Sequence, residues 1–166
     1  MKRPDPLPHL AALTAALGEP GPPAAGLLAL ETALGALIGH RLFTIMRHDA
    51  AAGCNARIHS SRPEAYPPGG RKPLADTAWT RQLIREGRSW IGRDRAAIAA
   101  HFPDHALIQA LGCDSILNLP VRWVGETIGT LNLLHQAGWY GEADVEVGRI
   151  VSGLAVPVLL AAGLPD

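Results

Sequence analysis

The sequence predicts an α+β domain in which helices pack on an antiparallel sheet, and three observations carry this prediction. Segments with strand-like alternation of apolar residues are separated by segments in which apolar residues recur at helical spacing. Two pairs of strand-like segments are each joined by a short glycine-containing turn, which is typical of hairpins. The order along the chain is helix, two strands, helix, strand, helix, two strands, helix, which indicates an antiparallel sheet covered by helices.

Length and charge exclude several classes of protein. The 166 residues suit one domain with a real core, and 15 basic side chains balance 15 acidic ones. Binding of nucleic acid or of an anionic membrane by a broad charged surface requires a basic surplus, so neither partner is expected. The richest apolar run, Gly148–Gly163, is interrupted by Arg149, Ser152 and Pro157, so no membrane-spanning segment is expected. The proline-broken first residues lack a signal-peptide core, which predicts a cytoplasmic location.

Residues 1–23 form a proline-rich segment. Its first prolines predict that residues 1–8 are not helical, and a short helix is expected over His9–Leu17. The breaker cluster Gly18–Pro23 ends this helix. The segment is therefore expected to precede the domain proper, which spans 24–162.

The domain is expected to begin and end with helices. Leucines recur at helical spacing over Ala24–Ile38, and Gly39 ends that segment. The closing helix is expected over Glu142–Leu160, and acidic residues at its start favour the positive end of a helix.

The first predicted hairpin joins a strand over Arg41–His48 to a strand over Ala56–Ser60. A glycine-containing turn over Ala50–Asn55 separates them. Side chains of the first strand alternate between two sides, with Leu42, Thr44 and Met46 on one and Phe43 and Ile45 on the other.

Between the two hairpins the sequence predicts a long loop, short helices and one short strand. Proline and glycine indicate a loop over Ser61–Pro73. A helix is expected to begin at Asp76 or Thr77 and to end at Glu86, before Gly87. Further along, the predictions are a strand over Ser89–Gly92 and a helical stretch over Arg93–Gln109 that is interrupted at Phe102–Asp104.

The best-defined unit is the second hairpin, Asp114–Leu134, with a tight turn around Gly125. If the turn has three residues, the numbers of cross-strand partners sum to 250, and Asn118 faces Asn132. A buried amide without partners costs about 1–3 kcal/mol. Either the two amides satisfy each other or nearby backbone, or they form the floor of a ligand pocket. The opposite face pairs Leu117 with Leu133, Leu119 with Leu131 and Val121 with Gly129, and is aliphatic.

The run Ser115–Leu134 resembles the C-terminal hairpin of GAF domains. In that family, a strand ending in proline, a glycine turn and an Ile-Gly-x-Leu-x-Leu strand precede a short acidic segment and a last helix. Here Pro120, Gly125 and the run Ile128–Leu133 match, and Trp139–Asp144 leads into the apolar closing helix. The resemblance extends over about 24–162 through the order of the elements.

This resemblance implies a GAF-like fold. A sheet of about five to six strands then lies between the terminal helices on one face and a lid of loops and short helices on the other. Family members bind small molecules under the lid and often dimerise through the terminal helices, so a small-molecule ligand and a second copy of the chain are the expected partners. Family ligands include cyclic nucleotides, tetrapyrroles, haem, amino acids and 2-oxo acids, so the fold does not identify a ligand or a cofactor.

One enzyme branch of the family, the free methionine-(R)-sulfoxide reductases, resembles this hairpin but uses cysteines and pocket carboxylates. The matching strand positions here hold Ile116, Asn132 and Leu134, none of which ionises. Cys113 is a weak candidate nucleophile and Cys54 a possible second thiol. A cysteine at such a position is more often a small buried apolar residue. Catalysis is therefore not favoured.

Other ligand classes find little support. His101 and His105 have the spacing of metal ligands on a helix, but Pro103 between them is expected to break that helix, and no third ligand follows. No metal site is therefore predicted. Bilin attachment in the family needs a lid cysteine followed by histidine, and the cyclic-nucleotide branch carries an Asn-Lys-Phe-Asp type signature. Neither is present.

The eight aromatic residues lie between positions 43 and 140, so the middle of the chain carries the large rings and the terminal helices carry none. The loop after the first hairpin presents Tyr66 between prolines and has basic residues that could receive an anion, although a solvated connection is the simpler interpretation. The rings could equally be ordinary core. The residues expected to line a ligand site are Arg62, Tyr66, Trp79, Trp90, Phe102, Ile116, Asn118, Asn132 and Leu134.

The function expected from the sequence is that of a sensory or regulatory GAF-like domain that binds a small, uncharged or weakly anionic metabolite. Two alternatives stay open: a GAF-fold redox enzyme that uses Cys113, and a dimerisation module without a ligand.

Overall fold

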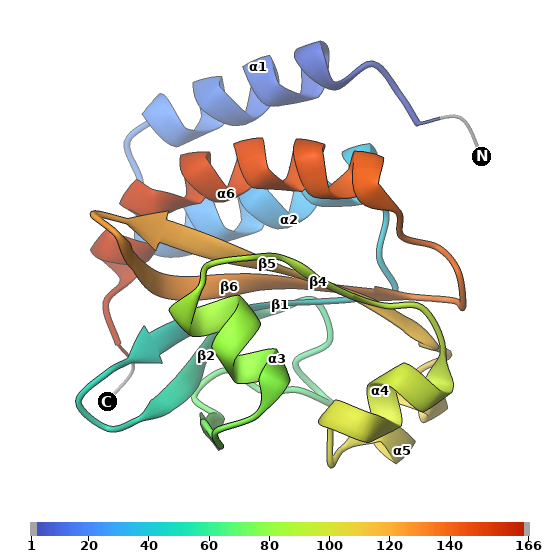
Figure 1. Ribbon diagram of the computed structural model, residues 1–166. Helices are drawn as coiled ribbons and strands as arrows, with labels where there is room; N and C mark the ends of the chain where they lie inside the picture. The colour runs from blue at the N-terminus through green and yellow to red at the C-terminus, as the bar shows by residue number, and fades with distance from the viewer. Residues whose placement is uncertain (1–2, 165–166) are drawn as a thin grey trace.

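A computed structural model describes residues 3–164 and shows one antiparallel sheet between two sets of helices (Figure 1). The sheet has six strands in the order β3-β2-β1-β6-β5-β4, and each neighbouring pair runs antiparallel. The predicted α+β class and strand number are confirmed. The strands are β1 Leu42–Asp49, β2 Cys54–Ser60, β3 Arg71–Pro73, β4 Trp90–Gly92, β5 Ser115–Trp123 and β6 Glu126–His135.

Each face of the sheet is covered by its own set of helices (Figure 1). On one side, called the helix face, α6 packs on β5, α2 lies beside α6, and α1 packs on both helices. The other side, called the cavity face, is covered by the lid, which is the chain between Ser61 and Ala110. The helices are α1 Pro6–Gly18, α2 Pro23–Leu37, α3 Ala78–Thr80, the π-helical turn η1 Arg81–Arg85, α4 Arg95–His101, α5 His105–Ala110 and α6 Glu142–Ala162.

The second hairpin pairs as the sequence predicts from Ile116 to Val121, where every partner sum is 250. The turn itself is different. Trp123 pairs with Glu126, so the turn has two residues, Val124 and Gly125, both with positive φ. Such a turn suits the twist of a hairpin. A bulge after Val121 restores the predicted register, because its extra residue replaces the third residue expected in the turn.

Helix α1 begins earlier than predicted, at Pro6. Asp5 caps it by accepting a hydrogen bond from the amide of Leu7 at 3.1 Å. The first amides of a helix have no partner within the helix, so proline is tolerated in the first turn. Leu13 is buried against α2 and α6, so this proline-rich segment contributes to the same core as the rest of the chain.

The loop predicted over Ser61–Pro73 contains a short strand that the sequence analysis missed. Strand β3 pairs with β2, with Ala56 opposite Arg71 and Cys54 opposite Pro73. Three residues are too few to show alternation, and proline is compatible with an edge strand. The predicted cap of the following helix is confirmed, because Thr77 accepts a hydrogen bond from the amide of Thr80 at 3.1 Å.

The main core lies on the helix face. Its sheet residues come from alternate positions of β1, β5 and β6, as the predicted alternation requires. Helix α6 is long and apolar enough to cross a membrane by length and composition. The sequence analysis expected no membrane-spanning segment, because it counted Arg149, Ser152 and Pro157 as interruptions of the apolar run. Val151, Ala155 and Leu159 of α6 are fully buried in this core.

Candidate functional site

A cavity of about 510 Å³ lies between the cavity face of the sheet and the lid. Alternate residues of four strands form its floor, because side chains of a strand point to one face at every second position. Leu42, Thr44 and Met46 of β1 line it, as the predicted alternation implies. The floor also includes Asn55, Arg57, Ile116, Asn118, Thr130, Asn132 and Leu134, and the lid contributes Tyr66, Lys72, Pro73, Leu74, Ala75, Thr77, Trp79, Thr80, His101, Phe102, Pro103, Asp104 and Ile108.

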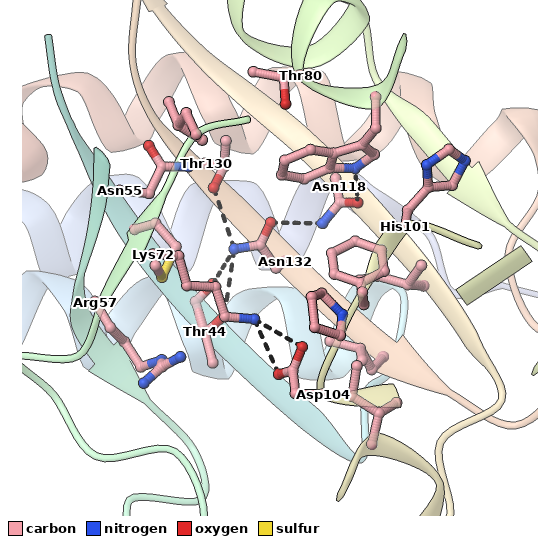
Figure 2. A pocket seen from close by; sticks show the side chains of 18 of the residues that line it. Thr44, Asn55, Arg57, Lys72, Thr80, His101, Asp104, Asn118, Thr130 and Asn132 are labelled. Atoms are coloured by element: carbon pink, nitrogen blue, oxygen red, sulfur yellow. Dashed lines mark hydrogen bonds and ion pairs between the residues drawn. The ribbon is translucent and has the colours of Figure 1, made fainter. Parts of the chain in front are cut away.

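The two predicted amides form the centre of the floor (Figure 2). Asn118 donates from Nδ2 to Oδ1 of Asn132 at 2.7 Å, and its own Oδ1 accepts from the indole of Trp79 at 3.1 Å. Asn132 donates from Nδ2 to the hydroxyls of Thr130 at 3.2 Å and Thr44 at 3.3 Å. The amides therefore satisfy each other, as one interpretation expected, and they also line the cavity.

Three aromatic rings of the lid side are in contact with one another. Trp79 meets Phe102 edge to face, with the ring centroids 5.4 Å apart. Trp90 lies against Phe102 at 5.9 Å and against His101 at 5.0 Å. Edge-to-face contacts of this kind stabilise an aromatic pair beyond the area that it buries. The rings of Trp79, Phe102 and His101 line the cavity, whereas Trp90 does not line it and packs against Phe102 and His101.

A polar network closes another part of the wall. The ammonium group of Lys72 lies 2.9 and 3.0 Å from the two carboxylate oxygens of Asp104, and the hydroxyl of Tyr66 donates to the same carboxylate at 2.8 Å. Burial alone would raise the pKa of Asp104, but Lys72 and the hydrogen bond from Tyr66 outweigh it, so the pKa lies below 3.8. Burial and the Asp104 carboxylate raise the pKa of Tyr66 well above 10. The carboxylate is charged and the phenol neutral at pH 7.

Seven of the nine predicted site residues line the cavity, and two do not. Trp90 packs against Phe102 and His101 outside the cavity lining. Arg62 is half-exposed and pairs with Glu64, with 2.6 Å between its Nε and the carboxylate. The seven that line the cavity are Tyr66, Trp79, Phe102, Ile116, Asn118, Asn132 and Leu134.

Sequence reasoning missed several polar residues of the cavity. Asp104 directly precedes α5, a position where aspartate often caps a helix, but it makes no capping hydrogen bond to α5 and instead binds Lys72 and Tyr66. Asn55 and Arg57 could have been found by extending the alternation of β1 to its hairpin partner, since Met46 pairs with Arg57. Asp94 does cap α4, because its side chain accepts a hydrogen bond from the amide of Ala97 at 2.9 Å.

Cys113 is fully buried beside Ile108 and Ile116 and does not line the cavity. Burial raises the pKa of its thiol to about 11. The thiolate is the nucleophilic form of cysteine, so a raised pKa disfavours reactivity at pH 7. This environment does not favour the redox enzyme that uses Cys113. Within residues 3–164 no group of three histidine, cysteine or acidic side chains is placed to hold a metal ion.

The fold and the cavity together define an α+β domain. Helices pack closely on one face of its sheet, and the lid encloses a cavity on the other face. No protein-family model and no curated protein matches the sequence. Solved structures with a matching fold include several GAF domains. The chain therefore has a GAF-like fold, as its second hairpin suggested.

Three of these structures cover nearly the whole chain. The GAF domain of a phosphoenolpyruvate-protein phosphotransferase from Coxiella burnetii has a TM-score of 0.75 and 14% identity, over 95% of this chain and 94% of that one. The corresponding domain from Acinetobacter has a TM-score of 0.73 and 12% identity, over 96% and 97%. The phycoerythrobilin-bound GAF domain of a cyanobacterial phytochrome has a TM-score of 0.71 and 20% identity, over 97% and 96%. Identities this low establish the fold alone.

Proposed function

We propose that this protein is a sensory or regulatory domain that binds a small organic molecule in the cavity between sheet and lid. The observation that carries the proposal is the cavity itself, which has the size of a ligand pocket and combines apolar walls with a few placed polar groups. A cavity of this volume in the middle of a fold costs packing energy. A ligand that fills it would recover that energy.

The comparisons support a regulatory role. The structures with the same fold include the GAF domain of a two-component sensor histidine kinase from Bacillus halodurans and the phytochrome domain with bound phycoerythrobilin. Strand β5 offers a route for a signal, because one of its faces lines the cavity and the other packs on α6. A ligand that moves β5 would thereby move a terminal helix.

We also propose that the domain forms a homodimer through its terminal helices. Four of the eight exposed large apolar side chains within residues 3–164 lie on these helices, namely Leu7, Leu28, Ile150 and Leu160. Light scattering coupled to gel filtration should give about twice the chain mass of 17.5 kDa. Leu28→Glu and Ile150→Glu should shift the mass towards one chain, and a wild-type protein of 17.5 kDa at all concentrations contradicts the dimer.

We also propose that the protein is located in the cytoplasm. Both cysteines are unpaired thiols in the structure, and a reducing compartment maintains thiols in this state.

A thermal-shift screen against a broad metabolite collection tests the binding function. A ligand present at 100 times its dissociation constant should stabilise the folded domain by about 2.7 kcal/mol. Asn118→Leu should abolish this response while the domain still folds, because the variant removes a central polar group of the cavity floor. Arg62→Gln is the matched control, since Arg62 lies outside the cavity.

Three results would contradict the proposal in different ways. If no metabolite class stabilises the wild-type domain, a dimerisation module without a ligand explains the chain better. If the Asn118→Leu variant responds to a ligand as the wild type does, the ligand does not bind at this floor. Turnover of free methionine sulfoxide that disappears in Cys113→Ser would establish the redox enzyme instead.

A further inference from the structure

Arg57 is a buried cation on the cavity wall that pairs with no acidic side chain of the described residues. Its side chain points from β2 into the cavity lining, and the residue is 6% exposed. Within residues 3–164 the only hydrogen bond of its guanidinium runs from Nη1 to the carbonyl of Pro67 at 3.0 Å. Its Nε is buried with no acceptor at all. The guanidinium also lies over the ring of Tyr66, 4.9 Å from its centroid.

A buried guanidinium normally has a carboxylate or phosphate partner, because desolvation of a lone charge is unfavourable. Burial accordingly lowers the pKa of Arg57, and the nearby Asp104 only partly opposes this. Arginine nevertheless keeps its charge in proteins. Among residues 3–164 the one carboxylate on the cavity wall is that of Asp104, and it is already paired with Lys72. Two cations and one anion therefore leave the wall with one uncompensated positive charge.

The backbone around Arg57 holds the guanidinium in place. The amide of Arg57 donates to the carbonyl of Gly70 at 2.8 Å, and its carbonyl accepts from the amide of Gly69 at 2.7 Å. A side-chain carbon at Gly70 would lie 2.6 Å from Nη1 of Arg57. The loop thus leaves room for this guanidinium, which is a preorganised arrangement rather than a mobile surface arginine.

The rest of the cavity offers little to a second charge. Figure 2 shows Arg57 on the β2 side of the cavity, with Asn118 and His101 on the opposite side. The amides of Asn118 and Asn132 already bind each other. Apolar side chains from both floor and lid complete the lining, including Leu42, Ile108, Ile116 and Leu134. A ligand with one negative charge and an apolar body complements this distribution, whereas a dianion such as a phosphate monoester exceeds the single free charge.

We infer that the ligand is a small organic monocarboxylate whose carboxylate is bound by the guanidinium of Arg57 and whose apolar body fills the cavity. The guanidinium fork matches the two oxygens of a carboxylate. This inference rests on the proposed binding function and specifies its ligand class.

Matched pairs of carboxylic acids and their primary amides test the inference, because the members of a pair share shape and differ in charge. Suitable pairs are benzoate with benzamide, 3-phenylpropanoate with 3-phenylpropanamide, and hexanoate with hexanamide. Binding is measured by thermal shift and by titration calorimetry on the wild-type chain and on Arg57→Gln. Arg62→Gln is the control for loss of a cation outside the cavity.

At least one acid should stabilise the wild type and bind at least tenfold more tightly than its amide. Arg57→Gln should reduce this preference to less than twofold, and Arg62→Gln should retain it. Equal affinity for acid and amide in the wild type overturns the inference without any variant and leaves the binding function intact. A preference that persists in folded Arg57→Gln also overturns it. If no acid binds while the broad metabolite screen finds a neutral ligand, the monocarboxylate class is wrong and the binding function stands.

Discussion

The two faces of the sheet use alternate residues of the same strands, yet they differ in composition. On the helix face, Phe43, Ile45, Leu117, Leu131 and Leu133 are all completely buried, and apolar helices pack directly on them. The cavity face is almost as buried, but polar residues occupy many of its positions, and an open volume separates it from the lid.

This difference shows how one sheet separates stability from recognition. Close packing on the helix face stabilises the fold, because each buried apolar group leaves water and fills space. On the cavity face the polar groups are bound mainly to one another, so they tolerate burial without filling the cavity. The exception is Arg57, whose buried Nε has no acceptor among the described residues and whose guanidinium is the proposed partner of a ligand carboxylate.

The largest expected effect compares two adjacent leucines of β6 that point to opposite faces. Leu133→Ala should lower the free energy of unfolding by about 2–5 kcal/mol, because it leaves a void in a close-packed core. Leu134→Ala should cost about 1–2 kcal/mol less, since Leu134 already borders a cavity and its loss creates little new void. Urea unfolding measures both variants. Equal losses would show that the two faces are packed alike.

A smaller effect tests the coupling of the floor amides. Asn132→Leu alone should cost about 1–3 kcal/mol, because it leaves the amide of Asn118 without its acceptor. In the Asn118→Leu/Asn132→Leu double variant both partners are apolar, so its loss should be smaller than the sum of the single losses by about 0.5 kcal/mol or more. Additive losses in the double-mutant cycle would contradict a direct interaction between the amides.

Acid should affect the two faces in different pH ranges. On the helix side, burial and the nearby cations Arg41 and Arg3 lower the pKa of His135 from 6.5 to about 4. Between these values the unfolded chain binds a proton that the folded domain does not, so stability falls as the pH drops from 6.5 to 4. His135→Phe, which keeps a ring against Trp139, should flatten this slope in unfolding measured at pH 7, 5.5 and 4.

The cavity face should respond only below this range. The folded-state pKa of Asp104 lies below the ordinary value of 3.8. The charged carboxylate therefore stabilises the fold fully above pH 3.8, and this stabilisation is lost as the pH falls through the folded-state pKa. Asp104→Asn should therefore reduce the loss of stability below pH 4 and leave the slope between pH 6.5 and 4 unchanged. If Asp104→Asn changed the slope between pH 6.5 and 4, the assignment of that pH range to the helix face would be wrong.

Much of the fold could be predicted because it depends on local patterns. The alternation of β1 follows from the period of a strand. The predicted pairing of Asn118 with Asn132 assumed a three-residue turn, and it holds because the bulge after Val121 replaces the third residue. The predictions failed where the decisive partner is distant or the pattern too short. The three-residue strand β3 is an example of a short pattern. The start of α1 at Pro6 was missed for a local reason, since prolines indicate a break in a helix although the first turn tolerates them.

The candidate site was predicted less completely. Seven of its lining residues were expected, because rings and paired amides stand out in a sequence that has few aromatic residues. Arg57 did not stand out, since an arginine in a strand is ordinarily exposed. Arg62, a neighbour in sequence with the same charge, was chosen instead.

The sequence by itself determined the class of the fold and which residues of each strand share a face. These features depend on the pattern of side chains within short stretches of the chain. Only the tertiary structure decided which charges meet. Lys72 and Asp104 pair across 32 positions of the chain, and that pairing leaves Arg57 without a carboxylate. Electrostatic compensation depends on distance in space, so it becomes visible only when the lid is folded over the sheet.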